Sequence, residues 1–91
     1  MSKIEIYTTR YCPYCTSAKA LLNRKNVQFS EIDVSSDPSG RATMIERANG
    51  RMTVPQIFVG EVHVGGSDDL HELERAGKLD ALLAQSKGQA A

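Results

Sequence analysis

Two cysteines separated by a proline and a tyrosine stand where a strand-like pattern changes into a helical one. The segment 3–8 alternates around Ile4 and Ile6 and ends in β-forming residues, which predicts a strand. From Pro13 onward, apolar residues recur every three or four positions, which predicts a helix. Cys12 would therefore cap this helix, with Pro13 in its first turn. The junction restricts the chain to folds in which a helix directly follows a strand.

Further along the chain, the apolar pattern changes between strand and helix periods several more times. The expected elements are a strand at 27–34, a helix with its N-cap in Ser36-Asp37, Pro38 in its first turn and its end at Asn49-Gly50, strands at 54–59 and 62–64, a helix capped by Ser67 and broken at Gly77, and a short helix from Leu79. Gly60-Glu61 fits a hairpin turn between two antiparallel strands, whereas the first two strands flank a helix and would be parallel. The order β-α-β-α-β-β-α predicts an α/β fold, a mixed four-stranded sheet flanked by helices.

Length and composition place this pattern in one small domain. The 91 residues carry 11 basic and 11 acidic side chains, so no overall field attracts nucleic acid or an anionic membrane. Charges interrupt the apolar residues near the N-terminus, and we expect neither a signal peptide nor a membrane span. We expect a monomeric, cytoplasmic protein with a single domain over 1–85 and a frayed tail over 86–91.

The cysteine pair predicts thiol-disulfide chemistry. A reducing cytosol rarely tolerates structural disulfides, so two cysteines in such a chain have another role. The free N–H groups of the first helical turn would stabilise the Cys12 thiolate and lower the pKa of this thiol. An acidic thiol also leaves readily from a mixed disulfide. Cys15 would face inward, close enough to form a disulfide. We therefore expect Cys12 to attack and Cys15 to resolve.

Two other interpretations of the cysteines compete with this one. A Cys-x-x-Cys pair can be half of a zinc site that His63 and His71 would complete, but their spacing matches no zinc finger. The cysteines would otherwise be inert buried thiols, which the intervening proline and tyrosine and the strand-to-helix position disfavour. We therefore expect redox chemistry and no metal.

Three separated motifs resemble the glutaredoxin family, in particular its short bacterial dithiol members. They are Tyr7-Thr8 ahead of Cys12-Pro13-Tyr14-Cys15, then Thr53-Val54-Pro55, and then Gly65-Gly66-Ser67-Asp68-Asp69, in the family's order. The resemblance covers Ile4 to about Leu83 and implies a thioredoxin-like fold. It also implies glutathione-dependent reduction of protein disulfides and of glutathione mixed disulfides. Glutathione would be a cosubstrate, the clients would be disulfide-containing or glutathionylated proteins, and no cofactor would be tightly bound.

The resemblance also implies where glutathione binds. Pro55 would be a cis-proline that makes Val54 offer its backbone N–H and C=O to the cysteinyl part of glutathione. Ser67 and Asp68 would meet the γ-glutamyl end, whose ammonium group suits a carboxylate. The remaining glutathione-binding positions would be Tyr14 beside the sulfur, Arg51 at the glycine carboxylate, Thr53 and Gly66.

Some of these positions also have simpler structural roles. Pro55 would equally suit an edge strand, Asp68 would favour a helix N-terminus by its charge, and Arg51 would suit an exposed surface. The sequence departs from the family at Thr9, where a lysine is frequent. The nearest cation is Arg10, which reaches the site only if the loop turns.

Two related functions remain open alongside glutathione-dependent reduction. One is a glutaredoxin-like electron donor reduced by thioredoxin reductase, although members of that group lack the Gly-Gly-x-Asp element that 65–69 carries. The other is an iron-sulfur carrier, a dimer bridged by a cluster on the first cysteine and two glutathiones. Pro13 and Tyr14 disfavour the carrier, because its site is typically glycine-rich.

Overall fold

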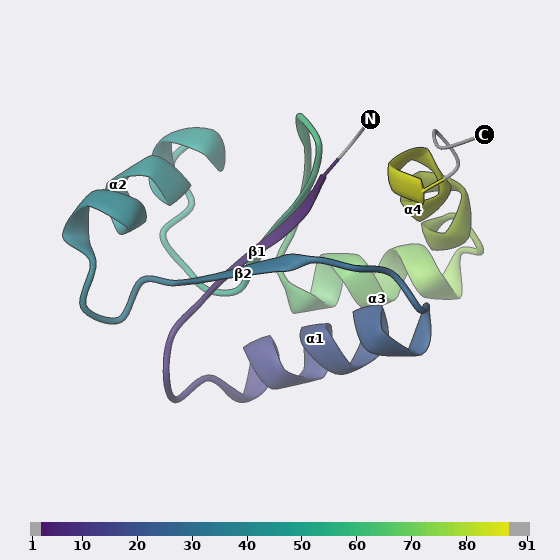
Figure 1. Ribbon diagram of the computed structural model, residues 1–91, viewed down its shortest axis with the longest axis horizontal. Helices are drawn as coiled ribbons and strands as arrows, with labels where there is room; N and C mark the ends of the chain where they lie inside the picture. The colour runs from purple at the N-terminus through teal and green to yellow at the C-terminus, as the bar shows by residue number, and fades with distance from the viewer. Residues whose placement is uncertain (1–2, 88–91) are drawn as a thin grey trace.

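The computed structural model describes residues 3–87, in which helices flank a four-stranded sheet (Figure 1). The strands are β1 (Ile4–Thr8), β2 (Ser30–Asp33), β3 (Gln56–Val59) and β4 (Val62–Gly65), and the helices are α1 (Pro13–Arg24), α2 (Pro38–Arg47), α3 (Ser67–Arg75) and α4 (Leu79–Lys87). This order confirms the expected α/β architecture, including the short helix from Leu79. No helix within the described residues has the length and apolar content needed to cross a membrane.

The sheet combines one parallel and two antiparallel strand pairs, in the order β2-β1-β3-β4. β1 runs parallel to β2, with Glu5 opposite Ser30, and antiparallel to β3. β3 and β4 form the expected hairpin, in which Val59 lies opposite Val62 and Gly60 has a positive φ of 61°. Glycine adopts that backbone conformation without steric strain, which suits the first position of the turn.

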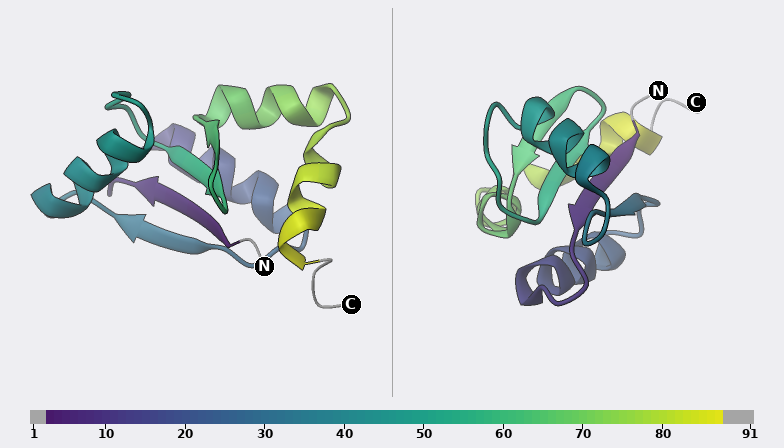
Figure 2. Two further views of the ribbon diagram at one scale, coloured as in Figure 1. Left: turned by 90° about the horizontal axis from the view of Figure 1, so that it is seen from above. Right: turned by 90° about the vertical axis from the view of Figure 1, so that its left-hand side faces the viewer.

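The helices divide between the two faces of the sheet, with α2 on one face and α1 and α3 on the other (Figure 2). The larger core lies on the side of α1, α3 and α4 and includes Ile6, Leu22, Ile57, Leu70 and Leu83. The smaller core lies beneath α2 and consists of Tyr7, Val34, Met44, Ala48 and Phe58. Adjacent residues of β1 and of β3 enter opposite cores because successive strand side chains point to opposite faces.

The second strand is shorter than the expected 27–34, because only Ser30–Asp33 pairs with β1. Asn26 has a positive φ of 57° and turns the chain after α1. Val27 and Phe29 then pack on the larger core without joining the sheet. Their apolar character therefore reflects burial in a loop and not strand pairing. Similarly, β3 begins only at Gln56, since proline has no N–H to donate to a ladder.

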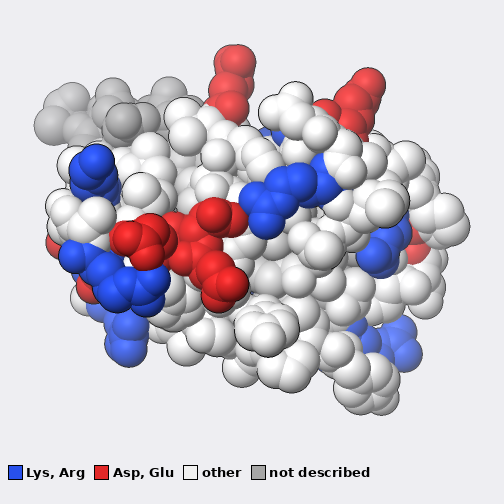
Figure 3. Space-filling view, turned by 180° about the vertical axis from the view of Figure 1, so that it is seen from behind, with Lys and Arg blue, Asp and Glu red and all other residues white. Residues whose placement is uncertain are grey.

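The surface over α3 carries both signs of charge side by side (Figure 3). Glu72 pairs with Arg75 along α3, and Lys25 at the end of α1 contacts Glu74 at 2.7 Å. Acidic side chains of α3 are therefore paired with basic side chains from α3 itself and from the end of α1. α4 continues to Lys87, so positions 86 and 87 of the expected tail are helical, and the rest of that tail, 88–91, lies outside the described residues.

Candidate active site

Cys12 caps the N-terminus of α1, as the sequence predicts. Its backbone is extended (φ −140°, ψ 98°), and Pro13 opens the helix, where an N–H is not needed. The Cys12 Sγ accepts a hydrogen bond from the Cys15 N–H at 3.0 Å, and the Cys12 carbonyl accepts one from the Thr16 N–H at 3.1 Å. The sulfur therefore faces the positive end of the helix, which stabilises a thiolate there.

Cys12 and Cys15 form a disulfide, with their Cα atoms 5.2 Å apart. Cys12 is partly exposed, whereas Cys15 is 2% exposed and lies against the core side of α1. An attacking thiolate must reach the sulfur it attacks. The Cys12 sulfur is therefore the open one, and the pair can exchange two electrons through a single accessible atom.

The segment before β3 passes beside the Cys12 sulfur. The Val54–Pro55 peptide bond is cis, as expected. The Val54 carbonyl oxygen lies 3.8 Å from the Cys12 Sγ, a distance at which a protonated thiol would donate a weak hydrogen bond. A peptide-like ligand bound to the Val54 backbone would therefore lie next to the reactive sulfur.

The cap of α3 differs from the sequence expectation by one residue, because Gly66 and not Ser67 precedes the helix. The Asp69 carboxylate accepts the Gly66 N–H at 2.8 Å and a hydrogen bond from Arg51 Nη1 at 3.1 Å. The Gly66 N–H and, more weakly, Arg51 hold the pKa of Asp69 below its ordinary value. The pairing of Asp69 with Arg51 and Gly66 was not among the expectations from the sequence, although an acidic residue three positions after a cap is a known signal.

The first turn of α3 presents one buried and one exposed side chain to the site. Ser67 is buried, and its carbonyl oxygen lies 2.8 Å from His71 Nδ1. His71 Nε2 lies 3.5 Å from the Ser17 hydroxyl, so this histidine links α3 to α1. Asp68 is exposed beside Ser67, at the positive end of the helix.

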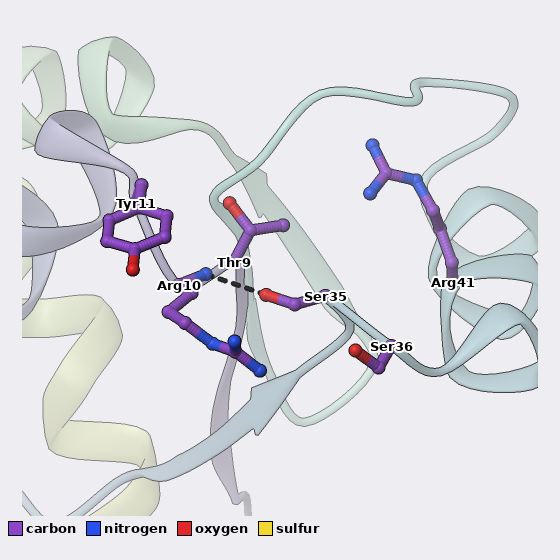
Figure 4. A pocket seen from close by; sticks show the side chains of 6 residues that line it. All are labelled: Thr9, Arg10, Tyr11, Ser35, Ser36 and Arg41. Carbon is purple, nitrogen blue, oxygen red and sulfur yellow. Dashed lines mark hydrogen bonds between the residues drawn. The ribbon is translucent and has the colours of Figure 1, made fainter.

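A pocket of about 370 Å³ opens next to the loop that leads to Cys12 (Figure 4). Its lining residues come from the loops after β1 and β2 and from α2: Thr9, Arg10, Tyr11, Ser35, Ser36 and Arg41. The Arg10 backbone N–H donates to Ser35 Oγ at 2.7 Å, and Arg41 donates to the Met52 carbonyl at 3.2 Å. Arg10 and Arg41 thus stand on opposite sides of the pocket, which suits an anionic group such as a carboxylate.

Exposed apolar side chains also lie close to Cys12 in the chain and beside the pocket. Tyr11 is 90% exposed and Tyr14 65% exposed. Met52, whose carbonyl accepts the bond from Arg41, is 64% exposed. Large exposed apolar side chains are common at sites where a protein contacts a partner.

The two histidines considered for a zinc site belong to separate hydrogen-bond networks. His63 lies 2.7 Å from Gln56 on β3, whereas His71 contacts Ser67 on α3. Within residues 3–87, no group of three or more His, Cys, Asp and Glu side chains is placed to hold a metal ion.

Comparison with known proteins agrees with the fold and the cysteine geometry. The family model named Glutaredoxin matches residues 4–64. The chain belongs to the glutaredoxin family. It is 60% identical to a glutaredoxin of Pseudomonas aeruginosa, over 92% of this chain and 99% of that protein. It is 51% identical to glutaredoxin 3 of Escherichia coli, over 91% of this chain and 99% of that protein.

Solved glutaredoxin structures share the architecture. The solution structure of glutaredoxin from Brucella melitensis is 60% identical and has a TM-score of 0.79, covering 91% of this chain and 89% of that one. A crystal structure of a buckwheat glutaredoxin–glutathione complex is 28% identical and has a TM-score of 0.84, covering 94% and 80%. These structures confirm the thioredoxin-like fold. As a glutaredoxin with a disulfide-forming Cys12–Cys15 pair, the protein is a thiol-disulfide oxidoreductase.

Proposed function

We propose that this glutaredoxin uses glutathione to reduce glutathione mixed disulfides and protein disulfides, with Cys12 as the nucleophile and Cys15 as the resolving thiol. The difference between the two sulfurs carries the proposal: Cys12 caps α1 and is partly exposed, whereas Cys15 is buried. An incoming disulfide would therefore react at Cys12. The buckwheat relative's complex with glutathione supports the choice of cosubstrate.

A glutathionylated client would require only one enzyme sulfur. The Cys12 thiolate attacks the glutathione sulfur, a bond forms between these two sulfurs, and the client leaves as a thiolate that takes up a proton. A second glutathione thiolate then attacks the sulfur of the enzyme-bound glutathione. Oxidised glutathione leaves, and Cys12 returns to its thiolate form.

A client with its own disulfide would need both cysteines. Attack by Cys12 joins the client to the enzyme and breaks the client disulfide. Cys15, once deprotonated, attacks the Cys12 sulfur and releases the client with both of its thiols reduced. The product is the Cys12–Cys15 disulfide, which two molecules of glutathione reduce in turn.

We propose that bound glutathione extends from α3 to the pocket beside Arg10. The Val54 backbone would pair with its cysteinyl residue, and Asp68 would bind its ammonium group. Arg51 faces Asp69, so the pocket between Arg10 and Arg41 is better placed for the glycine carboxylate. In this assignment, Arg10 and Arg41 serve in place of the frequent family lysine. The other proposed contacts are Tyr14, Thr53, Pro55, Gly66 and Ser67.

A coupled assay tests the proposed function directly. Glutathione, glutathione reductase and NADPH are supplied with a glutathionylated peptide, and NADPH consumption reports the oxidised glutathione that forms. We expect turnover that saturates with peptide and requires glutathione. Reduction of the enzyme by thioredoxin reductase without turnover of glutathione would contradict the proposal and indicate the electron-donor function instead.

We also propose that the protein works as a monomer in the cytoplasm, a compartment with a glutathione pool reducing enough to supply these electrons. Sedimentation equilibrium of anaerobically purified protein, combined with its visible absorption spectrum, tests the oligomeric state. A colourless monomer is expected. A coloured dimer would indicate the iron-sulfur carrier.

A further inference from the structure

Gln56, the first residue of β3, has a buried side chain whose polar atoms all have partners. Its exposure is 0%, and its Nε2 donates to the Thr53 carbonyl at 3.0 Å and to Thr53 Oγ1 at 3.2 Å. Its Oε1 lies 2.7 Å from His63 Nε2. A buried amide is unfavourable unless it is hydrogen-bonded, so these three bonds make a glutamine tolerable here. Two of the three hold a single residue, Thr53.

The direction of these bonds determines the tautomer of His63. A carbonyl only accepts hydrogen bonds, so the amide nitrogen of Gln56 must face Thr53 and its oxygen must face His63. His63 Nε2 therefore carries a hydrogen and donates it. Burial and, after it, the nearby charge of Arg51 lower the pKa of His63, which favours the neutral ring.

Packing fixes the position of the His63 ring. His63 lies opposite Phe58 in the β3–β4 pair, and the two rings stack with centroids 4.9 Å apart and an angle of 24° between their planes. The Arg47 guanidinium lies 4.1 Å from the centroid of the same Phe58 ring. His63 thus packs against Phe58 of the smaller core and directs a hydrogen-bond donor at Gln56.

The bond from Gln56 to Thr53 has a consequence at the neighbouring residue. The Thr53 carbonyl and the Val54 N–H belong to one planar peptide unit, in which they point in opposite directions. A fixed Thr53 carbonyl therefore fixes the direction of the Val54 N–H. This N–H is not among the backbone donors that bond within the described residues. The Val54 carbonyl, in turn, lies 3.8 Å from the Cys12 sulfur.

We propose that Gln56 and His63 are positioning residues for glutathione. His63 orients the Gln56 amide, and Gln56 holds the Thr53–Val54 peptide so that the Val54 N–H meets the cysteinyl backbone of the ligand. This inference rests on the proposed function, because it names residues that prepare the same site. The hydrogen bonds of the two side chains go to Thr53 and to each other and not to the reacting sulfurs, so both act on ligand binding and not on the reactivity of Cys12.

Paired substitutions test this role. Gln56→Met and His63→Leu remove the hydrogen bonds and keep most of the volume, whereas His63→Gln keeps an N–H near the position of Nε2. We expect the KM for a glutathionylated peptide to rise about three- to tenfold in Gln56→Met and His63→Leu, the effect of losing an ordinary interior hydrogen bond. His63→Gln should recover much of this loss, and kcat should stay within about twofold of wild type.

Two further measurements separate positioning from general damage. The rate at which iodoacetamide alkylates reduced Cys12 should be the same in Gln56→Met and His63→Leu as in wild type. In the ¹⁵N–¹H spectrum, the Val54 signal should shift in Gln56→Met and respond less to added oxidised glutathione than in wild type. Thr43→Ala is the matched control, because it removes an exposed hydrogen bond from Thr43 Oγ1 to the Ser39 carbonyl at 3.2 Å on α2. Its KM should be that of wild type.

The positioning role of Gln56 and His63 and the proposed function are contradicted by different results. An unchanged KM in folded Gln56→Met and His63→Leu overturns the positioning role, as does a loss of Cys12 alkylation in parallel with binding. If Gln56→Met does not fold, the comparison of His63→Leu with His63→Gln tests the positioning role. Equal KM values in these two variants would overturn that role. A wild-type enzyme that does not turn over glutathione overturns the proposed function itself.

Discussion

Replacement of Cys15 by serine should separate the two reductase activities. A glutathionylated client needs only the Cys12 sulfur. A client whose own disulfide has been broken stays bound to Cys12 through a mixed disulfide, and the neighbouring thiol releases it. Cys15 is buried, and its Cα lies 5.2 Å from that of Cys12. The Cys15→Ser protein should therefore keep its activity on glutathionylated peptide and lose most of its activity on protein disulfides.

The size of the loss follows from the geometry. If the resolving thiol ranges over a sphere whose radius equals the 5.2 Å Cα–Cα separation of the two cysteines, it occupies roughly 600 Å³, which corresponds to a local concentration of roughly 3 M. Glutathione supplied at about 1 mM is about three thousand times more dilute than this. Release of the client by glutathione alone should be slower by about a hundredfold or more, equivalent to at least ~2.7 kcal/mol in the barrier.

Both activities can be measured with one glutathione, glutathione reductase and NADPH system, given a glutathionylated peptide or a disulfide-bonded protein such as insulin. Cys12→Ser should abolish both activities. Mass spectrometry of Cys15→Ser after treatment with oxidised glutathione should find one adduct, on Cys12. Equal losses of the two activities in the two cysteine variants, or an adduct at another position, would refute the division of roles.

Four further results follow from the site. The pH profile of iodoacetamide alkylation at Cys12 should have its midpoint below the ~8.5 of a free thiol, and a midpoint at that value would contradict thiolate stabilisation at the cap. Asp68→Ala should raise the KM for glutathionylated peptide about two- to fivefold, as expected for an exposed ion pair, whereas an unchanged KM would leave Asp68 a helix-terminus role alone. Arg10→Ala and Arg41→Ala should raise the KM for glutathione more than the KM for its glycine ethyl ester. Equal effects on the two KM values would contradict binding of the glycine carboxylate in the pocket. Asp69→Asn should lower the melting temperature at neutral pH. Folding lowers the pKa of Asp69, so the contribution of its carboxylate to the free energy of unfolding is present above the unfolded pKa of ~3.9. This contribution is lost as the pH falls through the lower pKa of the folded protein. The melting temperatures of Asp69→Asn and wild type should therefore converge in acid.

The parts of the site that depend on adjacent residues were predictable from the sequence. Cys12 caps α1 and Pro13 opens it because the preferences of a helix N-terminus act over one turn. The hairpin at Gly60 follows from the same kind of local rule, as does the cap of α2 by Asp37, whose carboxylate accepts the Gly40 N–H at 2.9 Å.

The missed features depend on contacts between distant segments or on a choice between two similar residues. Glycine and serine both occur at helix caps. Gly66 is the cap here because the carboxylate of Asp69 accepts the hydrogen bond from the Gly66 N–H. Arg41 enters the pocket only because α2 packs on the sheet beside the loop after β1. Its helical surroundings give no local sign of this role. The apolar residues of 27–29 satisfied a strand pattern while lying in a buried loop, because periodicity reports burial and not pairing.

The donor that faces the Cys12 sulfur is a main-chain group, the Cys15 N–H at 3.0 Å. Every amino acid except proline supplies this N–H, so the bond survives almost any exchange of the side chain at position 15, including Cys15→Ser. Sequence drift in the loop before Cys12 can therefore change the contacts to clients and leave this support of the nucleophile in place. A threonine at position 9, in place of the lysine that the family resemblance implies, is compatible with a reactive Cys12 for this reason.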